Sequence, residues 1–196
     1  MTTMGRFFPT VIFCLYVPVP LIMLWMHGAA ALWPRLKRRA YLLHVPVYCG
    51  LVVAAAWSHR YIAAGAWAWP DAARAGGLVL VAAAFGLLAA TYRRIDSWTA
   101  MAGPQITASS RRTLITGGVY GVIRHPRYAV LVIGAAGNFL ATGYPLLLAA
   151  AAVTTMLTLI LVRVEDHELE RAFGDTYRQY RSQVPALVPR RPGPST

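Results

Sequence analysis

Charged residues are scarce in this chain, and acidic residues are the scarcest. Only 13% of the 196 residues are charged, whereas soluble domains carry about 25%. The chain has 7 Asp and Glu residues and 2 cysteines, while hydrophobic residues make up 57%. So few charges exclude intrinsic disorder, and so few cysteines exclude a disulfide-rich scaffold. The composition indicates an integral membrane protein with a single domain over residues 1–196.

The same scarcities argue against metal and nucleic acid as ligands. Cys14 and Cys49 lie inside apolar runs, and no group of Cys and His residues has metal-site spacing, so we expect no metal. The net charge of +12 suits a nucleic-acid ligand in principle. However, the basic residues stand at the ends of apolar runs, where they set membrane topology, so we expect no nucleic-acid partner.

Five apolar stretches are candidate transmembrane helices, which need roughly 20 residues each. They cover residues 7–33, 41–57, 76–92, 128–142 and 145–162. None of the five contains Asp, Glu, Lys or Arg, which argues against an ion or proton transporter. The short turn at residues 142–145 predicts a tight antiparallel hairpin. We therefore predict an all-α bundle of five transmembrane helices, followed by a cytoplasmic amphipathic C-terminal helix.

The distribution of positive charge predicts the topology. With five spans, 16 of the 19 Lys and Arg residues fall on one face of the membrane. Because cytoplasmic loops carry the excess of positive charge, the N-terminus is expected outside and the C-terminus inside. The Ala- and Arg-rich composition favours a bacterial source. We expect a multi-pass protein of the bacterial inner membrane, with any chemistry on the cytoplasmic side.

The acidic residues gather just after the last span, where five of the seven lie. Glu165 and Asp166 precede Leu169 by four and three residues, so a helix places both on one face with an apolar and aromatic stripe. The stripe consists of Leu169, Ala172, Phe173, Thr176, Tyr177 and Tyr180. One alternative is a surface helix whose carboxylates pair with Arg163 or Arg171. The other alternative is that the carboxylates bind a cationic ligand, because acidic groups suit an anionic lipid leaflet poorly.

The remainder of this acidic segment predicts a solvated helix with one break. Glu168, Glu170 and Arg171 lie off the stripe, so we expect solvent around them. Gly174 is expected to kink or end the helix, with Asp175 capping the next turn.

A second cluster, TGGVYGVIRHPRY, precedes the fourth span. Gly118 allows tight backbone conformations, and Pro126 suits the first turn of a helix. Arg124 and His125 then stand at a helix N-terminus, where unpaired N–H groups favour anions. The alternatives are that His125 only caps the helix and that Arg124 and Arg127 only set topology.

Both clusters flank the predicted hairpin on the same face of the membrane. Together they offer carboxylates, an anion site and tyrosine rings for stacking: Tyr120, Tyr128, Tyr177 and Tyr180. A ligand with an ammonium group, a carboxylate, an aromatic base and ribose hydroxyls would match them. S-adenosylmethionine has all of these groups.

The two clusters resemble the signature of the isoprenylcysteine carboxyl methyltransferase family. The resemblance covers residues 113–189, and phospholipid N-methyltransferases and bacterial small-thiol methyltransferases share the pattern. The matching residues are Gly118, Tyr120, Arg124, His125, Pro126, Tyr128, Glu165, Asp166, Leu169, Phe173, Gly174, Tyr177, Tyr180, Pro185 and Pro189. Two positions depart from it: Asp166 replaces a glutamate, and Val130 replaces a glycine.

The resemblance implies a membrane-integral methyltransferase that uses S-adenosylmethionine, with its cofactor region in residues 113–189. The implied cofactor-binding residues are Gly118, Tyr120, His125, Pro126, Tyr128, Glu165, Asp166, Tyr177 and Tyr180. Arg124 or Arg163 would steer an anionic acceptor. Asn138 would contact the acceptor or, alternatively, form a hydrogen bond between helices. The acceptor would be lipophilic, or a small anion or thiol.

Two other functions stay open at this point. Membrane sterol reductases, which use NADPH, look similar in the C-terminal region but differ around Glu165, Asp166 and Phe173. A non-enzymatic membrane accessory protein is the second alternative.

Overall fold

The computed structural model describes residues 13, 18–28, 33–36, 39–57, 65, 67–93, 95 and 113–189. Within these ranges every regular element is a helix, which confirms the predicted all-α class for the described part of the chain. The elements are α2 (Pro18–Gly28), α3 (Trp33–Leu36), α4 (Ala40–Trp57), α6 (Asp71–Tyr92), the 3-10 turn η2 (Gly118–Gly121), α9 (Pro126–Thr142), α10 (Pro145–Phe173) and α11 (Asp175–Gln183).

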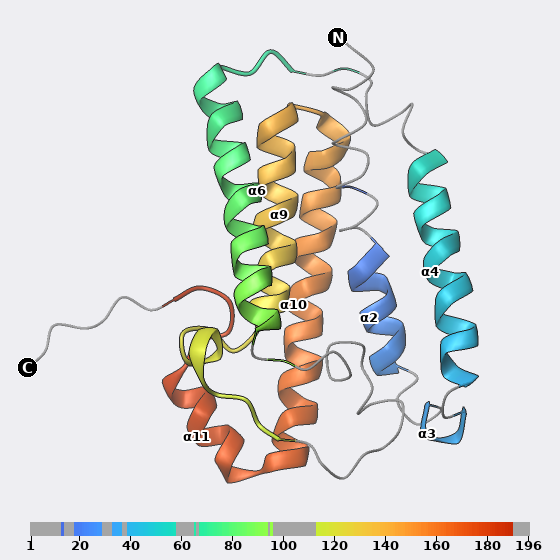
Figure 1. The fold of residues 1–196 in the computed structure, drawn as a ribbon, viewed down its shortest axis with the longest axis vertical. Helices are drawn as coiled ribbons and strands as arrows, with labels where there is room; N and C mark the ends of the chain where they lie inside the picture. Colours follow the sequence, from blue (N-terminus) through green and yellow to red (C-terminus); the bar gives the residue numbers. More distant parts are fainter. Residues whose placement is uncertain are drawn as a thin grey trace, which may run out of the picture.

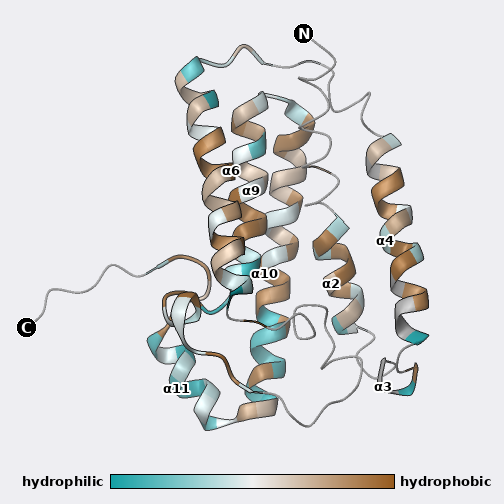
Figure 2. Ribbon diagram, viewed as in Figure 1, coloured by the Kyte–Doolittle hydropathy of each residue, from teal (hydrophilic) through white to brown (hydrophobic). Residues whose placement is uncertain are grey.

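Three helices, α6, α9 and α10, run side by side and form the centre of the molecule (Figure 1). Helix α2 packs against α10, and α4 lies beyond α2 at the edge opposite α6. At one end of the bundle, η2 lies by the end of α6 and α11 folds back beside α10. The hydrophilic residues of α10 and α11 gather at this same end (Figure 2). The bundle is therefore apolar along most of its length and polar at one end.

Two of the described helices, α6 and α10, are long and apolar enough to cross a membrane by length and composition. They correspond to two of the five predicted spans, and the count of five remains a prediction. Helix α9 has 17 residues and α4 has 18, with Pro46 inside it. Most of residues 7–33 lies outside the described ranges. Its described part forms α2, which begins at Pro18, and the first residue of α3.

The end of the last span differs from the prediction. Helix α10 continues without a break from Pro145 through the acidic segment to Phe173, so the fifth span and the acidic helix are one element. Gly174 ends it with a φ of 55°, a left-handed value that favours glycine. The expected capping by Asp175 is wrong: Gly174 is the N-cap residue of α11, and no side chain caps it. The Asp175 carboxylate instead accepts a hydrogen bond from Arg178 at 2.6 Å.

Small residues bring α6 and α9 into close contact. A Cβ atom added at Gly77 would lie 2.2 Å from the backbone nitrogen of Ala141. One added at Gly137 would lie 2.9 Å from the carbonyl oxygen of Gly77. Backbone-to-backbone approach of this kind is how helices associate where lipid removes the hydrophobic driving force between them. The glycines therefore fix the distance between the two helices.

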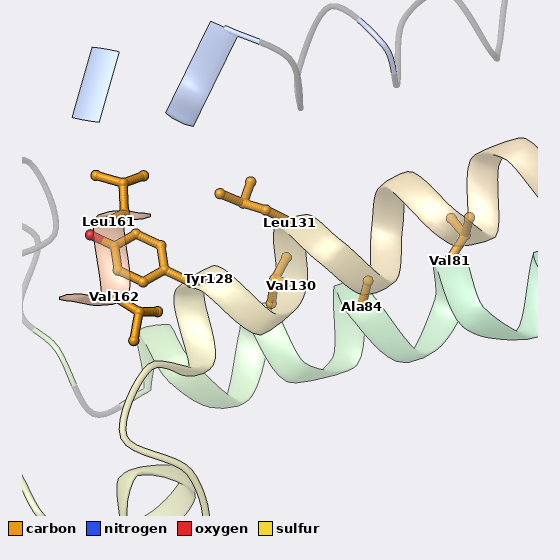
Figure 3. Close-up of a cluster of buried hydrophobic side chains, with 7 residues drawn as sticks. All are labelled: Val81, Ala84, Tyr128, Val130, Leu131, Leu161 and Val162. Atoms are coloured by element: carbon orange, nitrogen blue, oxygen red, sulfur yellow. The ribbon is translucent and has the colours of Figure 1, made fainter. Parts of the chain in front are cut away.

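The core next to this contact joins α6, α9 and α10 (Figure 3). It consists of Val81, Ala84, Tyr128, Val130, Leu131, Leu161 and Val162. Val130, one of the two departures from the family pattern, is 3% exposed here. The extra side chain at this position thus fills the helix interface.

The turn between α9 and α10 is as short as predicted. Thr142 ends α9, and Gly143 follows with a φ of 72°. The backbone N–H of Trp67 donates to the carbonyl of Gly143 at 2.9 Å, and Trp67, Trp69 and Phe139 meet edge to face with centroids 5.5–5.9 Å apart. Aromatic residues therefore mark the end of the bundle away from the acidic segment of α10.

Gly76 and Gly77 make a matched pair for testing the α6–α9 contact. Gly77→Ala should destabilise the protein by about 1–3 kcal/mol because its methyl group meets the backbone of α9. Gly76→Ala should be neutral or stabilising by up to about 1 kcal/mol, since nothing lies within 4 Å of its Cβ position. Thermal unfolding in detergent measures both changes. Equal melting temperatures for the two variants would contradict this packing.

Candidate active site

The start of α9 is held by the chain that follows α11. The backbone N–H groups of Arg124 and His125 donate to the carbonyls of Pro185 and Ala186 at 2.8 and 3.0 Å. Pro126 occupies the first turn of α9, where its missing N–H costs nothing, and His125 is the N-cap residue. Two segments about 60 residues apart are thus fixed beside each other at the polar end of the bundle.

Asp166 on α10 connects this backbone arrangement to the charged side chains. Its carboxylate accepts hydrogen bonds from Arg124 Nη2 at 2.9 Å, from His125 Nε2 at 2.7 Å and from the hydroxyl of Tyr177. The residue is 6% exposed. A carboxylate so deeply buried requires this number of donors and a compensating positive charge. Asp166 therefore joins α9, α10 and α11 through one side chain.

His125 lies between the two adjacent carboxylates. Its Nε2 faces Asp166, and its Nδ1 lies 3.4 Å from Oε2 of Glu165. Burial alone would lower the pKa of His125, but the hydrogen bonds and charges of Asp166 and Glu165 outweigh burial and raise the pKa to about 8. At neutral pH the ring is a cation that donates from both nitrogens. The Glu165 side chain is 29% exposed, so a ligand can reach it.

The four tyrosines of the sequence prediction surround this cluster. Tyr128 stacks on the His125 ring with centroids 5.7 Å apart. The Tyr180 hydroxyl donates to the carbonyl of Tyr120 at 2.5 Å and so ties α11 to η2. Burial raises the pKa of Tyr180 to about 12. Burial, together with the carboxylate of Asp166, raises the pKa of Tyr177 as well. Both phenols are therefore neutral donors at physiological pH.

The structure brings the two sequence clusters together in an arrangement that the sequence did not predict. Their cationic and anionic groups were expected to bind different groups of one ligand, whereas Arg124 and His125 pair directly with Asp166. Arg124 also donates to the carbonyls of Val184 and Arg181. Its Nε is buried and has no hydrogen-bond partner among the described residues. One donor of the cluster is thus left unused.

Other predicted site residues lie at varying distances from this cluster. Gly118 begins η2 with a φ of 63°, which glycine adopts without strain. The side chain of Arg163 on α10 is exposed, and no described ion pair links it to the cluster. Asn138 is 3% exposed and lies 13 residues along α9 from His125, or roughly 20 Å at 1.5 Å per residue. The structure therefore places Asn138 away from the charged cluster.

Two acidic residues that were expected to be solvated are paired. Glu168 lies 3.0 Å from His27 of α2, and Glu170 accepts hydrogen bonds from Arg178 and Arg181 at 2.7 and 3.3 Å. The solvated assignment was therefore wrong for Glu168, because it considered one helix without α2, which packs on it. Glu170 lies at the surface as predicted, and its partners are exposed arginines. The one sequence signal for His27 is that it is the sole histidine in the stretch 7–33.

The chain matches the family described as phospholipid methyltransferase over residues 72–176, which is more than half of its length. The chain belongs to the phospholipid methyltransferase family. The matched region contains α6, α9 and α10, and with them Arg124, His125, Glu165 and Asp166. It begins after α2 and α4 and ends just before Tyr177.

Individual relatives of the family are similar over shorter stretches. A protein-S-isoprenylcysteine O-methyltransferase of Schizosaccharomyces pombe is 34% identical over 94 residues, which are 43% of this chain and 37% of the relative. A methanethiol S-methyltransferase 2 of Bradyrhizobium diazoefficiens is 35% identical over 95 residues, 48% of this chain and 35% of the relative. Protein-S-isoprenylcysteine O-methyltransferase B of Arabidopsis thaliana is 31% identical over 86 residues, 43% of this chain and 44% of the relative. The chain thus spans less than half the length of each.

Stability should depend on pH through His125. Its pKa is 6.5 when unfolded and about 8 when folded, so its stabilising charge is fully present below pH 6.5 and is lost as the pH rises through 8. We expect wild-type protein to lose up to about 2 kcal/mol of stability over this interval. Melting temperatures between pH 6 and 9 measure the loss, with His125→Gln as the control. Identical pH profiles for the two proteins would contradict the assignment.

Removing the charge of Asp166 should destabilise the fold. Asp166→Asn leaves the buried Arg124 and His125 cations without their counter-ion, which costs about 3–5 kcal/mol. Glu170→Gln removes a carboxylate that pairs only with half-exposed arginines, so its cost should stay below about 1 kcal/mol. Chemical denaturation in detergent compares the two variants. A cost of similar size for both would show that the Asp166 pairing is not what stabilises this end of the bundle.

Proposed function

We propose that this protein is an integral membrane methyltransferase that uses S-adenosylmethionine and methylates a lipophilic acceptor or a small anion or thiol. The observation that carries the proposal is the Asp166 network. It joins the two motif segments into one charged cluster inside the region that matches the phospholipid methyltransferase family. The membrane part of the proposal rests on the apolar lengths of α6 and α10.

The residues of the cluster fit the chemical groups of the proposed cofactor. Glu165 offers a partly exposed carboxylate for an ammonium group or ribose hydroxyls. The unused Nε donor of Arg124 suits a carboxylate. The positive charge of His125, whose two nitrogens already face Asp166 and Glu165, favours it electrostatically. The partly exposed ring of Tyr120 suits stacking with an adenine base, whereas Tyr128 is buried and supports the site through its stack on His125. The complementary charges therefore come from α10 and the residues just before α9, and the aromatic face comes from η2.

Glu165 and Asp166 are adjacent in sequence but suited to different tasks. The oxygens of Asp166 are already occupied by three donors inside the protein, and the residue is buried. Glu165 lies 3.4 Å from Nδ1 of His125 and also interacts with Tyr128 and Arg127, but its side chain is 29% exposed. We assign the direct contact with a cationic ligand to Glu165, and the positioning of Arg124 and His125 to Asp166.

At this site, methyl transfer would be accelerated mainly by holding the two reactants in the right geometry. S-adenosylmethionine would supply a methyl group on its sulfonium. An acceptor carboxylate or thiolate would bond to that carbon in line as the carbon–sulfur bond breaks and S-adenosylhomocysteine leaves. The chain's residues hold the two reactants, exclude water and keep the local charge fixed. The neutral phenols of Tyr177 and Tyr180 maintain the cluster without adding charge. An exposed cation on α10, Arg163, is placed to attract an anionic acceptor towards this end of the bundle.

The charge around the site supports a proposal for which side of the membrane it faces. The polar end of the bundle carries the arginines that flank α9 and follow the apolar part of α10: Arg124, Arg127, Arg163, Arg171, Arg178 and Arg181. An excess of arginine marks the cytoplasmic side of membrane proteins. We propose that the site faces the cytoplasm, in a bacterial inner membrane, and that residues 113–189 carry the cofactor region.

Calorimetry with S-adenosylhomocysteine tests the proposal directly. Wild-type protein in detergent should bind it and should not bind NADPH. Glu165→Gln should weaken binding roughly tenfold, because a hydrogen bond to a charged group is lost, whereas Glu170→Gln should bind as wild type does. Asp166→Ala should abolish binding through collapse of the cluster, which circular dichroism and melting temperature would register.

Three other results would overturn the proposal. Folded wild-type protein that binds NADPH alone would be a reductase. Folded protein that binds neither ligand would fit an accessory role. If Glu165→Gln bound S-adenosylhomocysteine as tightly as wild type does, the cofactor would have to bind elsewhere than at this cluster.

A further inference from the structure

Helix α2 contributes a charged contact next to the proposed site, although it lies outside the region that matches the family. The helix packs along α10 on the side away from α6 (Figure 1). At its C-terminal end, His27 Nδ1 lies 3.0 Å from Oε1 of Glu168, and the His27 side chain is only 7% exposed. This ion pair joins α2 to the acidic part of α10.

The pair lies close to the reactive end of the site. Glu168 is three residues after Glu165, so the two carboxylates share one side of α10. Glu165 faces His125 of α9, while Glu168 faces His27 of α2. Helices α9 and α2 therefore each bring a histidine to the acidic stretch of α10, and α2 borders the partly exposed Glu165.

The rest of α2 presents an apolar surface to the same region. Val19, Met23 and Leu24 pack against the core that includes Tyr128 and Leu161. The Arg127 side chain, at the start of α9, reaches Sδ of Met23 at 3.9 Å. Helix α2 therefore covers the side of the bundle beside Glu165, and a lipophilic molecule that reached Glu165 from this side would contact α2.

This ion pair is half-buried, since the Glu168 side chain is 30% exposed, and such a pair contributes little net stability because desolvating the charges offsets much of their attraction. Apolar side chains of similar volume at 27 and 168 would hold α2 on α10 at least as well. The pair does fix which part of α2 lies at which level of α10, since only one register brings the imidazole to the carboxylate. Its specific contribution is therefore geometric.

We propose that His27 is a positioning residue that acts through Glu168 to hold α2 against α10, where α2 lines the acceptor side of the site. This inference rests on the proposed function. His27 has no hydrogen bond or ion pair with Arg124, His125 or Asp166 among the described residues, although the charge of Glu165 acts on its ring. We therefore expect the pair to affect cofactor binding less than it affects acceptor binding. The pair governs how the acceptor is held.

Methyl-transfer kinetics can separate these two effects. We would use wild type, His27→Gln, Glu168→Gln and the double variant, with radiolabelled S-adenosylmethionine and two probe acceptors, methanethiol and an N-acetylated isoprenylcysteine. For the acceptor that wild type methylates, each single variant should raise the acceptor KM roughly fivefold to tenfold. The double variant should be no worse than either single variant, because both remove the same contact. The Kd of S-adenosylhomocysteine should stay within about twofold of wild type.

A reversed pair distinguishes positioning from general packing. His27→Glu combined with Glu168→His restores opposite partners in the same register and should recover most of the acceptor KM. Glu170→Gln, on the same helix but paired away from α2, is the matched control and should leave the KM unchanged. Melting temperatures confirm that each variant is folded at the assay temperature.

Three results would overturn the inference about His27 alone, and one would overturn the proposed function. Active wild-type protein whose acceptor KM is unchanged in both single variants would overturn the inference about His27 alone. Additive losses in the double variant, or a weakened Kd for S-adenosylhomocysteine with an unchanged acceptor KM, would also overturn it. Wild-type protein that binds no S-adenosylhomocysteine and transfers no methyl group would instead remove the proposed function on which it rests.

Discussion

The buried carboxylate of Asp166 is the interaction on which the polar end of this protein depends. It lies on α10, yet its hydrogen-bond donors come from the residues before α9 and from α11. Without it, Arg124 and His125 would be buried cations next to the apolar core. Because the chain after α11 also pairs its backbone with these two residues, the start of α9 is fixed by both main-chain and side-chain contacts. The cluster is in this sense part of the fold and part of the site.

Continuity of α10 makes this arrangement rigid. The helix carries an apolar surface towards α9 and α2 over its first part, and its acidic residues follow without a break. The carboxylates are therefore positioned by the same helix that packs in the bundle. The close α6–α9 contact at Gly77 and Gly137 holds the other side of the bundle. Charged groups stay at fixed separations because the apolar part of the molecule leaves the helices little room to shift.

Sequence alone predicted the elements that local patterns determine. The α9–α10 hairpin, the helix break at Gly174 and the inward position of Asp166 follow from turn residues and helical periodicity, and the structure confirms them. Pairings between distant segments could not be read in this way. The contacts of Glu168 with His27, and of Arg124 with Val184, depend on how helices pack, which periodicity does not specify. The unbroken α10 was missed because a change from apolar to charged residues looks like a boundary even where the backbone continues.

The family match covers only part of the chain, and this bears on how an acceptor is selected. The charged cluster lies on elements within residues 72–176, whereas α2 and α4 lie outside them. Relatives that are similar to this chain to the same degree carry names with very different acceptors, methanethiol in one and isoprenylcysteine in another. The region that these proteins share can account for the reaction that they share, which is methyl transfer. It cannot by itself distinguish a one-carbon thiol from a prenylated cysteine. Discrimination between acceptors of such different size requires a surface that differs among these proteins. We propose that α2, which lies outside the matched region and beside Glu165, contributes to this discrimination.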